Sequence, residues 1–188
     1  KNEPAHDVYA WGHGADGQLG TGQFGWLTQL PVAVESLHGA RVVQLSCGGG
    51  AEEYHSAAVT EEGVLLTWGS GQSGQLGHGD VARLNLPRQV MALKDRAVKH
   101  VACGSSFTAC LVGEGTVFTF GRGHFGQLGL GDERNIAYPT RVEALAEKRM
   151  VQLACGSAHA MALGDNGQVF TWGWNVNGQL GHGDVANS

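Results

Sequence analysis

The sequence predicts an all-β fold built from repeated four-stranded antiparallel sheets, which is the organisation of a β-propeller. Three observations lead to this prediction. The four letters GQLG occur four times, a short apolar run precedes each of them, and 31 of the 188 residues are glycine without the every-third-residue period of collagen. About 7% glycine is usual, so the excess indicates a chain with many tight turns.

The apolar runs give the repeat period. They read VYAWG, LLTWG, VFTFG and VFTWG, and their closing glycines are Gly12, Gly69, Gly121 and Gly173, separated by 57, 52 and 52 residues. A proline and then a Cys-Gly pair follow in step, at Cys47, Cys103 and Cys155. Four extra residues after Cys47 and one before Pro31 explain the longer first interval. The repeats therefore span about 8–64, 65–116 and 117–168, with a partial copy at 169–188.

Each repeat contains four apolar runs, which in the third are VFTFG, PTRVEAL, MVQLACG and HAMAL. Short β-branched or aromatic runs between turn residues are typical of strands. We therefore expect each repeat to form one four-stranded sheet, the scale of a propeller blade. About three and a half blades are visible, and residues 1–188 are expected to form one domain that is incomplete as a ring.

The GQLG word itself is predicted to be structural. Its glycines allow successive tight turns, its leucine anchors the loop, and its glutamine amide bonds turn backbone. The residues assigned this role are Gly17, Leu19, Gly20, Gly74, Leu76, Gly77, Gly126, Leu128, Gly129, Gly178, Leu180 and Gly181.

A phosphate-binding loop is the functional alternative, because GHGADG, GSGQSG and GRGHFG match G-x-G-x-x-G after a strand. That fingerprint requires a following helix, whereas QLG and a further glycine follow here. In the fourth copy, GWNVNG, Asn175 replaces the second glycine, and asparagine tolerates the left-handed conformation. The motif is therefore interpreted as a turn.

Other repeat positions also favour structure over chemistry. Trp11, Trp68, Phe120 and Trp172 share one position, which predicts packing between blades rather than ligand stacking. The three recurring cysteines are expected to be small buried residues a blade apart, and not metal ligands. Two pairs of histidines recur as well, and bonds to backbone are expected for them: His55 with His159, and His78 with His182. No catalytic motif occurs, so no catalytic residue, metal or cofactor is expected.

Composition narrows the partners and the compartment. The net charge is −5 and basic residues form no run, which argues against nucleic acid and anionic membranes as partners. No apolar stretch approaches the length of a membrane helix, and the first residues do not resemble a signal peptide. Four cysteines without a C-x-x-C pair fit reduced thiols, so an intracellular location, cytoplasmic or nuclear, is expected.

The units resemble the repeats of the regulator of chromosome condensation (RCC1-like) family. The resemblance rests on V-F-T-W-G, on G-Q-L-G-x-G-D with its following proline, and on A-C-G-S-x-H. It implies a seven-bladed β-propeller of about twice this length, so we expect the chain to be a piece of a larger protein. It also implies four kinds of function: nucleotide exchange on the GTPase Ran, docking in ubiquitin ligases and kinases, ciliary scaffolding, and ultraviolet perception in plants.

Two of these functions fit the sequence poorly. The resembling photoreceptors carry Gly-Trp-Arg-His-Thr where this chain has GSSFT (104–108) and GSAHA (156–160), so their tryptophan cluster and ion pairs are missing. The exchange factor uses a protruding wedge, whereas the largest insertion here is four residues between Gly49 and Tyr54.

The sequence therefore predicts a non-enzymatic protein-binding module or scaffold, with an exchange factor for a Ran-like GTPase as the alternative. A small GTPase, a ubiquitin-pathway protein or a ciliary protein are the partners considered. Partner contacts are expected where the repeat is broken, at Glu52, Glu53, Tyr54, Phe24, Trp26 and Trp174. A solvated loop with locally packed aromatic residues remains the alternative at each of these positions.

Overall fold

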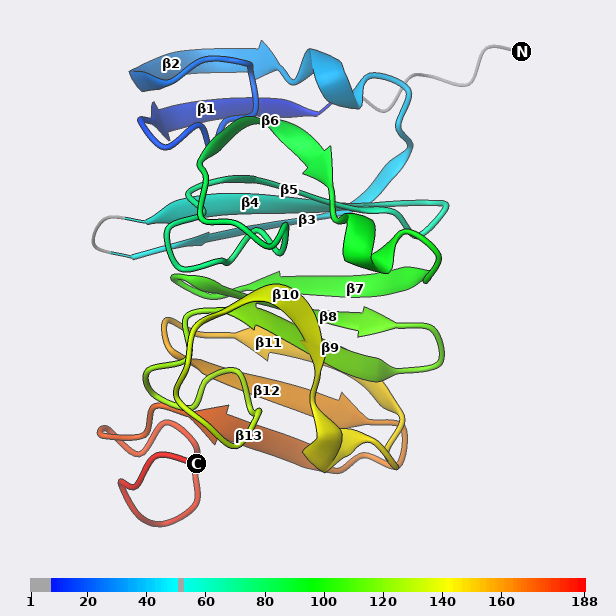
Figure 1. Ribbon diagram of the computed structural model, residues 1–188, viewed down its shortest axis with the longest axis vertical. Coiled ribbons are helices and arrows are strands. Elements are labelled where there is room, and N and C mark those ends of the chain that lie inside the picture. Colours follow the sequence, from blue (N-terminus) through cyan, green and yellow to red (C-terminus); the bar gives the residue numbers. More distant parts are fainter. Residues whose placement is uncertain (1–7, 51–52) are drawn as a thin grey trace.

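The computed structural model describes residues 8–50 and 53–188, and they form four antiparallel sheets stacked along the long axis of the molecule (Figure 1). Two complete four-stranded sheets lie between a two-stranded and a three-stranded sheet. The strands are β1 (Tyr9–Gly14) and β2 (Gly25–Ala33); β3 (Val42–Gly49), β4 (Tyr54–Thr60), β5 (Leu65–Gly69) and β6 (Leu84–Gln89); β7 (Val98–Cys103), β8 (Phe107–Val112), β9 (Thr116–Gly121) and β10 (Ile136–Arg141); β11 (Met150–Cys155), β12 (His159–Gly164) and β13 (Val169–Gly173). The predicted all-β repeat fold is confirmed.

The sheets do not coincide with the sequence repeats, contrary to the expectation. The sheet β3–β6 takes its first two strands from the end of one repeat and its last two from the start of the next. A period fixes the spacing of equivalent strands but not which strand begins a sheet. The hairpin register fixes that, since β4 pairs with β5 from His55–Gly69 to Val59–Leu65.

The run PTRVEAL also differs from its prediction as one strand. Strand β10 ends at Arg141, and a single 3-10 turn, η3 (Glu143–Leu145), follows it. The same turn recurs as η1 (Glu35–Leu37) and η2 (Met91–Leu93), and the last leucine of each is buried. This leucine is buried beneath the segment that connects neighbouring sheets. Its burial explains why the run PTRVEAL is apolar at its end although the strand has already ended.

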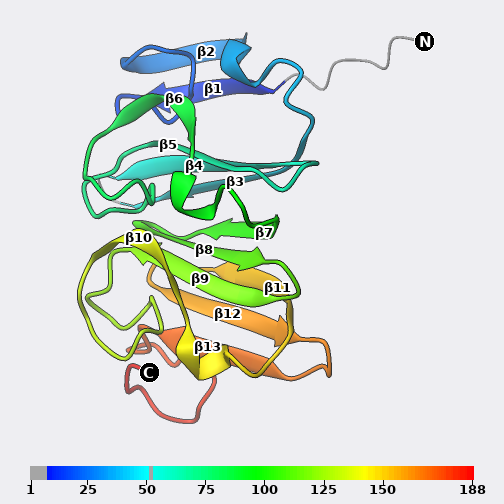
Figure 2. The same ribbon diagram turned by 45° about the vertical axis from the view of Figure 1, so that its right-hand side comes forward.

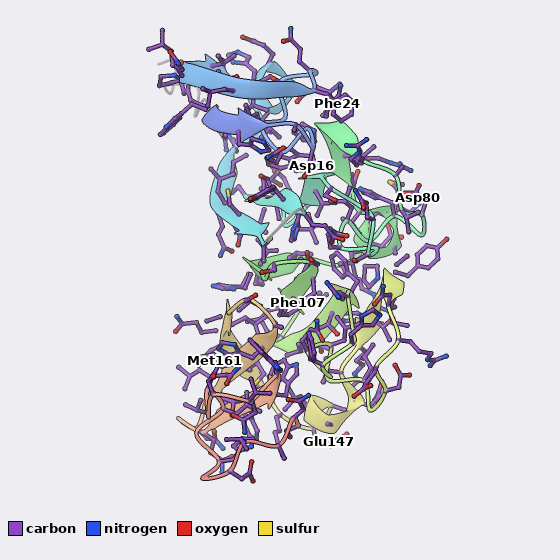
Figure 3. All side chains as sticks on the ribbon, turned by 90° about the vertical axis from the view of Figure 1, so that its left-hand side faces the viewer. Asp16, Phe24, Asp80, Phe107, Glu147 and Met161 are labelled. Carbon is purple, nitrogen blue, oxygen red and sulfur yellow. The ribbon has the colours of Figure 1, made fainter. Side chains whose placement is uncertain are left out.

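Side chains from neighbouring sheets interlock to form the core. Phe107 of β8 is fully buried, and Figure 3 shows it within the stack. It packs in one apolar cluster with Ala160 of the next sheet and with Trp172. Apart from the three 3-10 turns, the described residues form no helix, and no helix among them is long and apolar enough to cross a membrane.

Alternation of strand direction brings one set of loops to one end of the stack, on the left of Figure 1 and toward the viewer in Figure 3. We call it the GQLG end. It comprises the loops 15–24, 70–83 and 122–135, the segment 174–188, and the short hairpin loops after β3, β7 and β11. The 3-10 turns lie at the opposite end, as both views of the ribbon show (Figures 1 and 2).

Candidate functional site

The GQLG turns form a repeated hydrogen-bonded frame. In all four copies the glutamine Oε1 accepts a bond from the backbone N–H two residues earlier, at 2.9 Å for Asp16, Ser73 and Asn177 and 2.8 Å for Phe125. The glycines on either side have positive φ, for example 72° at Gly126 and 66° at Gly129. The predicted role of the glutamine amide is confirmed, and the loops are held by their own backbone.

The leucine of each word lies in the protein interior, and in three of the four copies a threonine bonds its carbonyl. Thr67, Thr119 and Thr171 donate to the carbonyls of Leu76, Leu128 and Leu180 at 2.6, 2.6 and 2.8 Å. These threonines occupy one repeat position in β5, β9 and β13. The frame is therefore fixed to the sheet beneath it.

The strand-end aromatic residues join each frame to the next sheet. Trp68 Nε1 donates to the carbonyl of Gln18 at 2.8 Å, and Trp172 Nε1 donates to that of Gln127 at 2.9 Å. A Cβ atom at Gly20 would lie 2.8 Å from Trp68 Nε1, so this glycine admits the ring of the following sheet. The interpretation as packing between blades holds at these two residues and at Phe120, which is fully buried against Gly77, whereas Trp11 is 60% exposed.

The expectation for Asn175 was wrong. It does not have positive φ, and the glycine that it replaces does not have it either in the other three copies. A Cβ atom at Gly71 or Gly123 would instead collide with the carbonyl of Ala82 or Arg134. Asn175 replaces that close contact by hydrogen bonds: its Nδ2 donates to the carbonyl of Ala186 at 3.0 Å, and its Oδ1 accepts from the N–H of Leu180 at 2.9 Å.

Three of the recurring histidines bond hydroxyl groups, which corrects the expectation for His55 and His182, while His78 also has a hydrogen bond to the backbone of Thr67. His78 Nε2 lies 3.1 Å from Thr67 Oγ1, and His182 Nε2 lies 2.9 Å from Thr171 Oγ1. Because these hydroxyls already donate to leucine carbonyls, the imidazole Nε2–H is the donor. Burial, followed by the nearby Arg88 cation, lowers the pKa of His78 to about 4.

His55 follows the same pattern across a sheet boundary. Its Nε2 lies 2.9 Å from Thr108 Oγ1, and Thr108 donates onward to the carbonyl of Gln75 at 2.8 Å. Its Nδ1 is buried without a partner. Burial lowers the pKa of His55 to about 4, so this histidine is neutral at pH 7.

The four cysteines are free thiols. Burial raises the pKa of Cys103 and of Cys110 to about 12, and burial also raises that of Cys155. The described residues contain no group of three or more His, Cys, Asp or Glu side chains that could hold a metal ion. The expected burial holds for Cys103, whereas Cys155 is half-buried and Cys47 is exposed.

At the GQLG end, the first residue after each strand-closing glycine varies while its backbone stays fixed. These residues are His13, Ser70, Arg122 and Trp174. The N–H groups of Ser70, Arg122 and Trp174 bond the carbonyls of Tyr54, Ser106 and Ala158 in the adjacent hairpin at 2.7, 2.8 and 2.9 Å. The frame thus presents histidine, arginine and tryptophan at three equivalent places, while Ser70 at the fourth is fully buried.

The acidic insertion is bound to this frame. Glu53 accepts bonds from Ser73 Oγ at 3.1 Å and from Gln75 Nε2 at 2.9 Å. The N–H of Tyr54 points at Asp16 Oδ2 at 3.4 Å, and the Tyr54 ring meets the edge of His13 with centroids 5.5 Å apart. Glu53 therefore has a structural role, while Tyr54 remains partly open to solvent.

The other predicted contact residues divide into two places. Phe24 is 54% exposed, and the Arg83 guanidinium lies 5.9 Å from its ring centroid; Figure 3 shows Phe24 near Asp16. Trp174 is half-buried against Phe125, with ring centroids 5.6 Å apart. Glu52 lies outside the described residues, and the same holds for the side chain of Trp26.

Sequence reasoning missed Arg122 and Phe125, which lie with Trp174 at this end. Both residues occupy variable (x) positions of the G-x-G-x-x-G motif GRGHFG, and only the glycines of that motif were interpreted. Their residue types were therefore a signal that could have been used. In the hairpin loops, Ser105 Oγ and Ser157 Oγ lie 2.8 Å apart. These serines stand where the resembling photoreceptors have tryptophan.

A cavity of about 360 Å³ lies between β1 and the sheet β3–β6. It is mostly apolar and is lined by Trp11, Leu45, Cys47 and Trp68 among others. At the next boundary the equivalent of Leu45 is Val101, which is fully buried beside β3 and β4. The cavity therefore marks the place where the first sheet has two strands instead of four.

The comparisons agree with this architecture. The chain is 38% identical over 179 residues to the ultraviolet-B receptor UVR8 of Arabidopsis thaliana, covering 95% of this chain and 40% of that protein. It is 38% identical over 178 residues to the human E3 ubiquitin-protein ligase HERC2, covering 94% of this chain and 4% of that protein. It thus spans less than half the length of these relatives.

Solved structures show the same fold. Human WBSCR16 matches with a TM-score of 0.81 and 32% identity, over 97% of this chain and 46% of that one. Prp20p of Saccharomyces cerevisiae matches with a TM-score of 0.80 and 24% identity, over 98% and 45%. The family profile described as the RCC1-like domain matches residues 7–188, and the chain therefore belongs to the RCC1-like domain family.

Proposed function

We propose that this RCC1-like propeller segment is a non-enzymatic protein-docking module that binds its partner at the GQLG end. One observation carries the proposal: equivalent positions on a hydrogen-bonded frame carry chemically different side chains, of which His13 is exposed and Arg122 and Trp174 are partly exposed. A frame whose loops are fixed loses little conformational entropy on binding, which favours recognition by preorganised side chains. Burial lowers the pKa of His55 and raises those of Cys103 and Cys110, which supports a binding role more than a catalytic one for these groups.

Site-specific photo-crosslinking tests the proposal. A photo-reactive amino acid at Gln72 or His124, both exposed at the GQLG end, is compared with one at Glu114 or Asn166, both exposed at the opposite end. In cells that express the full-length protein, we expect the same protein to be crosslinked from the first pair and not from the second. Crosslinking of that protein from the second pair alone would contradict the proposal.

The alternative function, nucleotide exchange on a Ran-like GTPase, has less support in the geometry. The four-residue insertion, which is short for a wedge, is also held at its described end, because Glu53 and Tyr54 bond the frame. The likeness to Prp20p is at 24% identity and concerns the fold. Release of labelled GDP from Ran is the test, and unchanged release in the presence of the intact protein would remove the alternative.

A further inference from the structure

We propose that Arg122, with the Phe125–Trp174 ring pair, is a docking point for an acidic peptide segment in which an Asp or Glu neighbours a large apolar side chain. The inference rests on the proposed function and names the chemistry of the partner at one place on the GQLG end. It begins with the arginines of the chain.

Arg122 differs from every other arginine in the described part of the chain. Each of the others lies within ion-pair distance of a carboxylate or over an aromatic ring: Arg41 with Glu61, Arg83 with Asp16, Arg88 with Asp80, Arg134 with Asp132, Arg141 with Glu143, Arg149 with Glu114, and Arg96 over Phe118. The contact found for the Arg122 guanidinium is with His124, whose Nδ1 accepts from Arg122 Nε at 3.3 Å.

This arrangement leaves the two terminal nitrogens of Arg122 available for a ligand. The backbone N–H of Arg122 is fixed to Ser106 O, and its Nε is directed to His124. A guanidinium matches a carboxylate through two parallel N–H···O bonds. Among the described residues of the GQLG end, Glu53 and Asp16 bond the frame, Asp132 pairs with Arg134, and no carboxylate forms an ion pair with Arg122, so the carboxylate comes from the partner.

The ring pair supplies the second contact. Phe125 lies in the same loop as Arg122, and it meets Trp174 of the next sheet at an interplanar angle of 34°. Both rings are partly exposed. Aromatic residues beside an arginine are the side chains that most often dominate the energy of protein interfaces, and here they would cover an apolar residue adjacent to the bound carboxylate.

A peptide is favoured over a nucleic acid by charge. Aromatic rings also stack on bases, but a chain with net charge −5 and a single unpaired arginine at this site lacks the several phosphate contacts that nucleic-acid binding requires. One carboxylate and one apolar side chain match what the site offers.

Selection of random heptapeptides on the 188-residue chain, followed by anisotropy with synthetic labelled peptides, tests the inference. We expect selected peptides to share an Asp or Glu next to Phe, Trp or Leu, and to bind at least tenfold more weakly when that acid is changed to Asn or Gln. Arg122→Ala and Trp174→Ala should each weaken binding at least tenfold, and Arg122→Lys should weaken it less than Arg122→Ala.

The matched control is Arg88→Ala, which removes an exposed arginine that pairs with Asp80 and should leave binding unchanged; urea unfolding checks that the Arg122 and Trp174 variants remain folded. Equal binding of the acid and amide peptides, equal effects of Arg122→Ala and Arg88→Ala, or Arg122-dependent binding of a thymidine dodecamer in place of peptides would overturn the inference. Peptides that crosslink to the GQLG end without needing Arg122 would overturn it while leaving the proposed function standing, and peptides that bind only the opposite end would contradict both.

Discussion

At the scale of single residues, the carbonyl of the GQLG glutamine shows how the repeats tolerate substitution. It receives bonds from both Ser56 and Trp68 at Gln18, from Thr108 alone at Gln75, and from Trp172 alone at Gln127. In the copy whose aromatic residue is Phe120, which has no N–H group, the hydroxyl of Thr108 is the donor. In the copy with Ala160 at the hydroxyl position, the indole of Trp172 is the donor. A buried carbonyl without a donor is costly, so one donor is retained each time.

Thr108→Ala should therefore destabilise the chain more than Ser56→Ala. The first change removes the donor to Gln75 and the acceptor for His55, at a cost of about 2–3 kcal/mol, whereas the second leaves Trp68 on Gln18 and costs about 1 kcal/mol or less. Urea unfolding at pH 7 measures both. Adding Phe120→Trp to Thr108→Ala recreates the Ala160–Trp172 pair and should recover part of the loss. Equal costs for the two single changes would show that the second donor does not matter.

His55, which is buried at the boundary with Thr108, predicts that acid lowers the stability of the folded chain. The pKa of His55 is lowered to about 4 by burial, against an ordinary value near 6.5, so the unfolded chain binds a proton that the folded chain does not. The contribution of His55 should lower the free energy of unfolding by about 3 kcal/mol as the pH drops from about 6.5 to about 4. Above that range this contribution should change little.

His55→Phe, which copies the Phe107–Ala160 contact of the next boundary, should remove this part of the pH dependence. Unfolding free energies at pH 7 and pH 4.5 for both chains provide the measurement. His78 titrates in the same direction, so a residual slope is expected. An undiminished difference between the two pH values in the variant would show that His55 is not responsible.

At the scale of elements, the inner strands predict where the stack can be strengthened. The side chain of Gln44 in β3 makes two bonds to the backbone of Val101 in β7, both at 3.0 Å, and Ser46 Oγ accepts from the N–H of Cys103 at 3.0 Å. In β7 the equivalent residues are His100 and Ala102, and His100 Nδ1 is buried without a partner. The contact between β7 and β11 therefore lacks three bonds that the contact between β3 and β7 has.

Transferring these bonds should stabilise the chain. His100→Gln with Ala102→Ser is expected to raise the free energy of unfolding by about 1–2 kcal/mol, because each added bond contributes about 1 kcal/mol less the cost of ordering the side chain. The reverse exchange, Gln44→His with Ser46→Ala, should lower it by a similar amount. Thermal or urea unfolding of the two double variants gives opposite shifts if the bonds are responsible, and shifts of the same sign would refute this account.

The elements also show what the sequence could and could not predict. Alternating apolar runs and turn residues identified the strands, because their side chains and turns are dictated locally. The boundary between sheets was misplaced by two strands, since it depends on which strands pair, such as β4 with β5, and the repeat period does not specify this. Among the candidate site residues, Trp174 was predicted because it breaks the repeat. Arg122 was missed, because a guanidinium without an ionic partner is recognised only in the structure, once the partners of the other arginines are known.

At the scale of the whole molecule, burial changes along the stack. Leu45 in β3 is 49% exposed, while the equivalent Val101 and Leu153 are 1% and 3% exposed. Cys47 is exposed, while Cys103 and Cys110 are buried. Each inner sheet is covered by the first two strands of the sheet before it, and the described first sheet, β1–β2, supplies only the last two. Stability in such a stack is a sum of sheets and their boundaries, so the first boundary is the weakest.

Thiol labelling measures this difference directly. In the folded 188-residue chain, a disulfide reagent at pH 8 should react rapidly with Cys47 and with the other three cysteines only on unfolding, because their thiols are shielded and burial raises their pKa. Cys47→Ser should abolish the rapid phase, and rapid reaction of two or more thiols would contradict the burial pattern. In a longer protein whose added strands cover Leu45 and Cys47 as β3 and β4 cover Val101 and Cys103, the rapid phase should disappear without any mutation. Persistence of rapid labelling there would show that the first boundary stays open, and that the surface beside Trp11 is available to a partner.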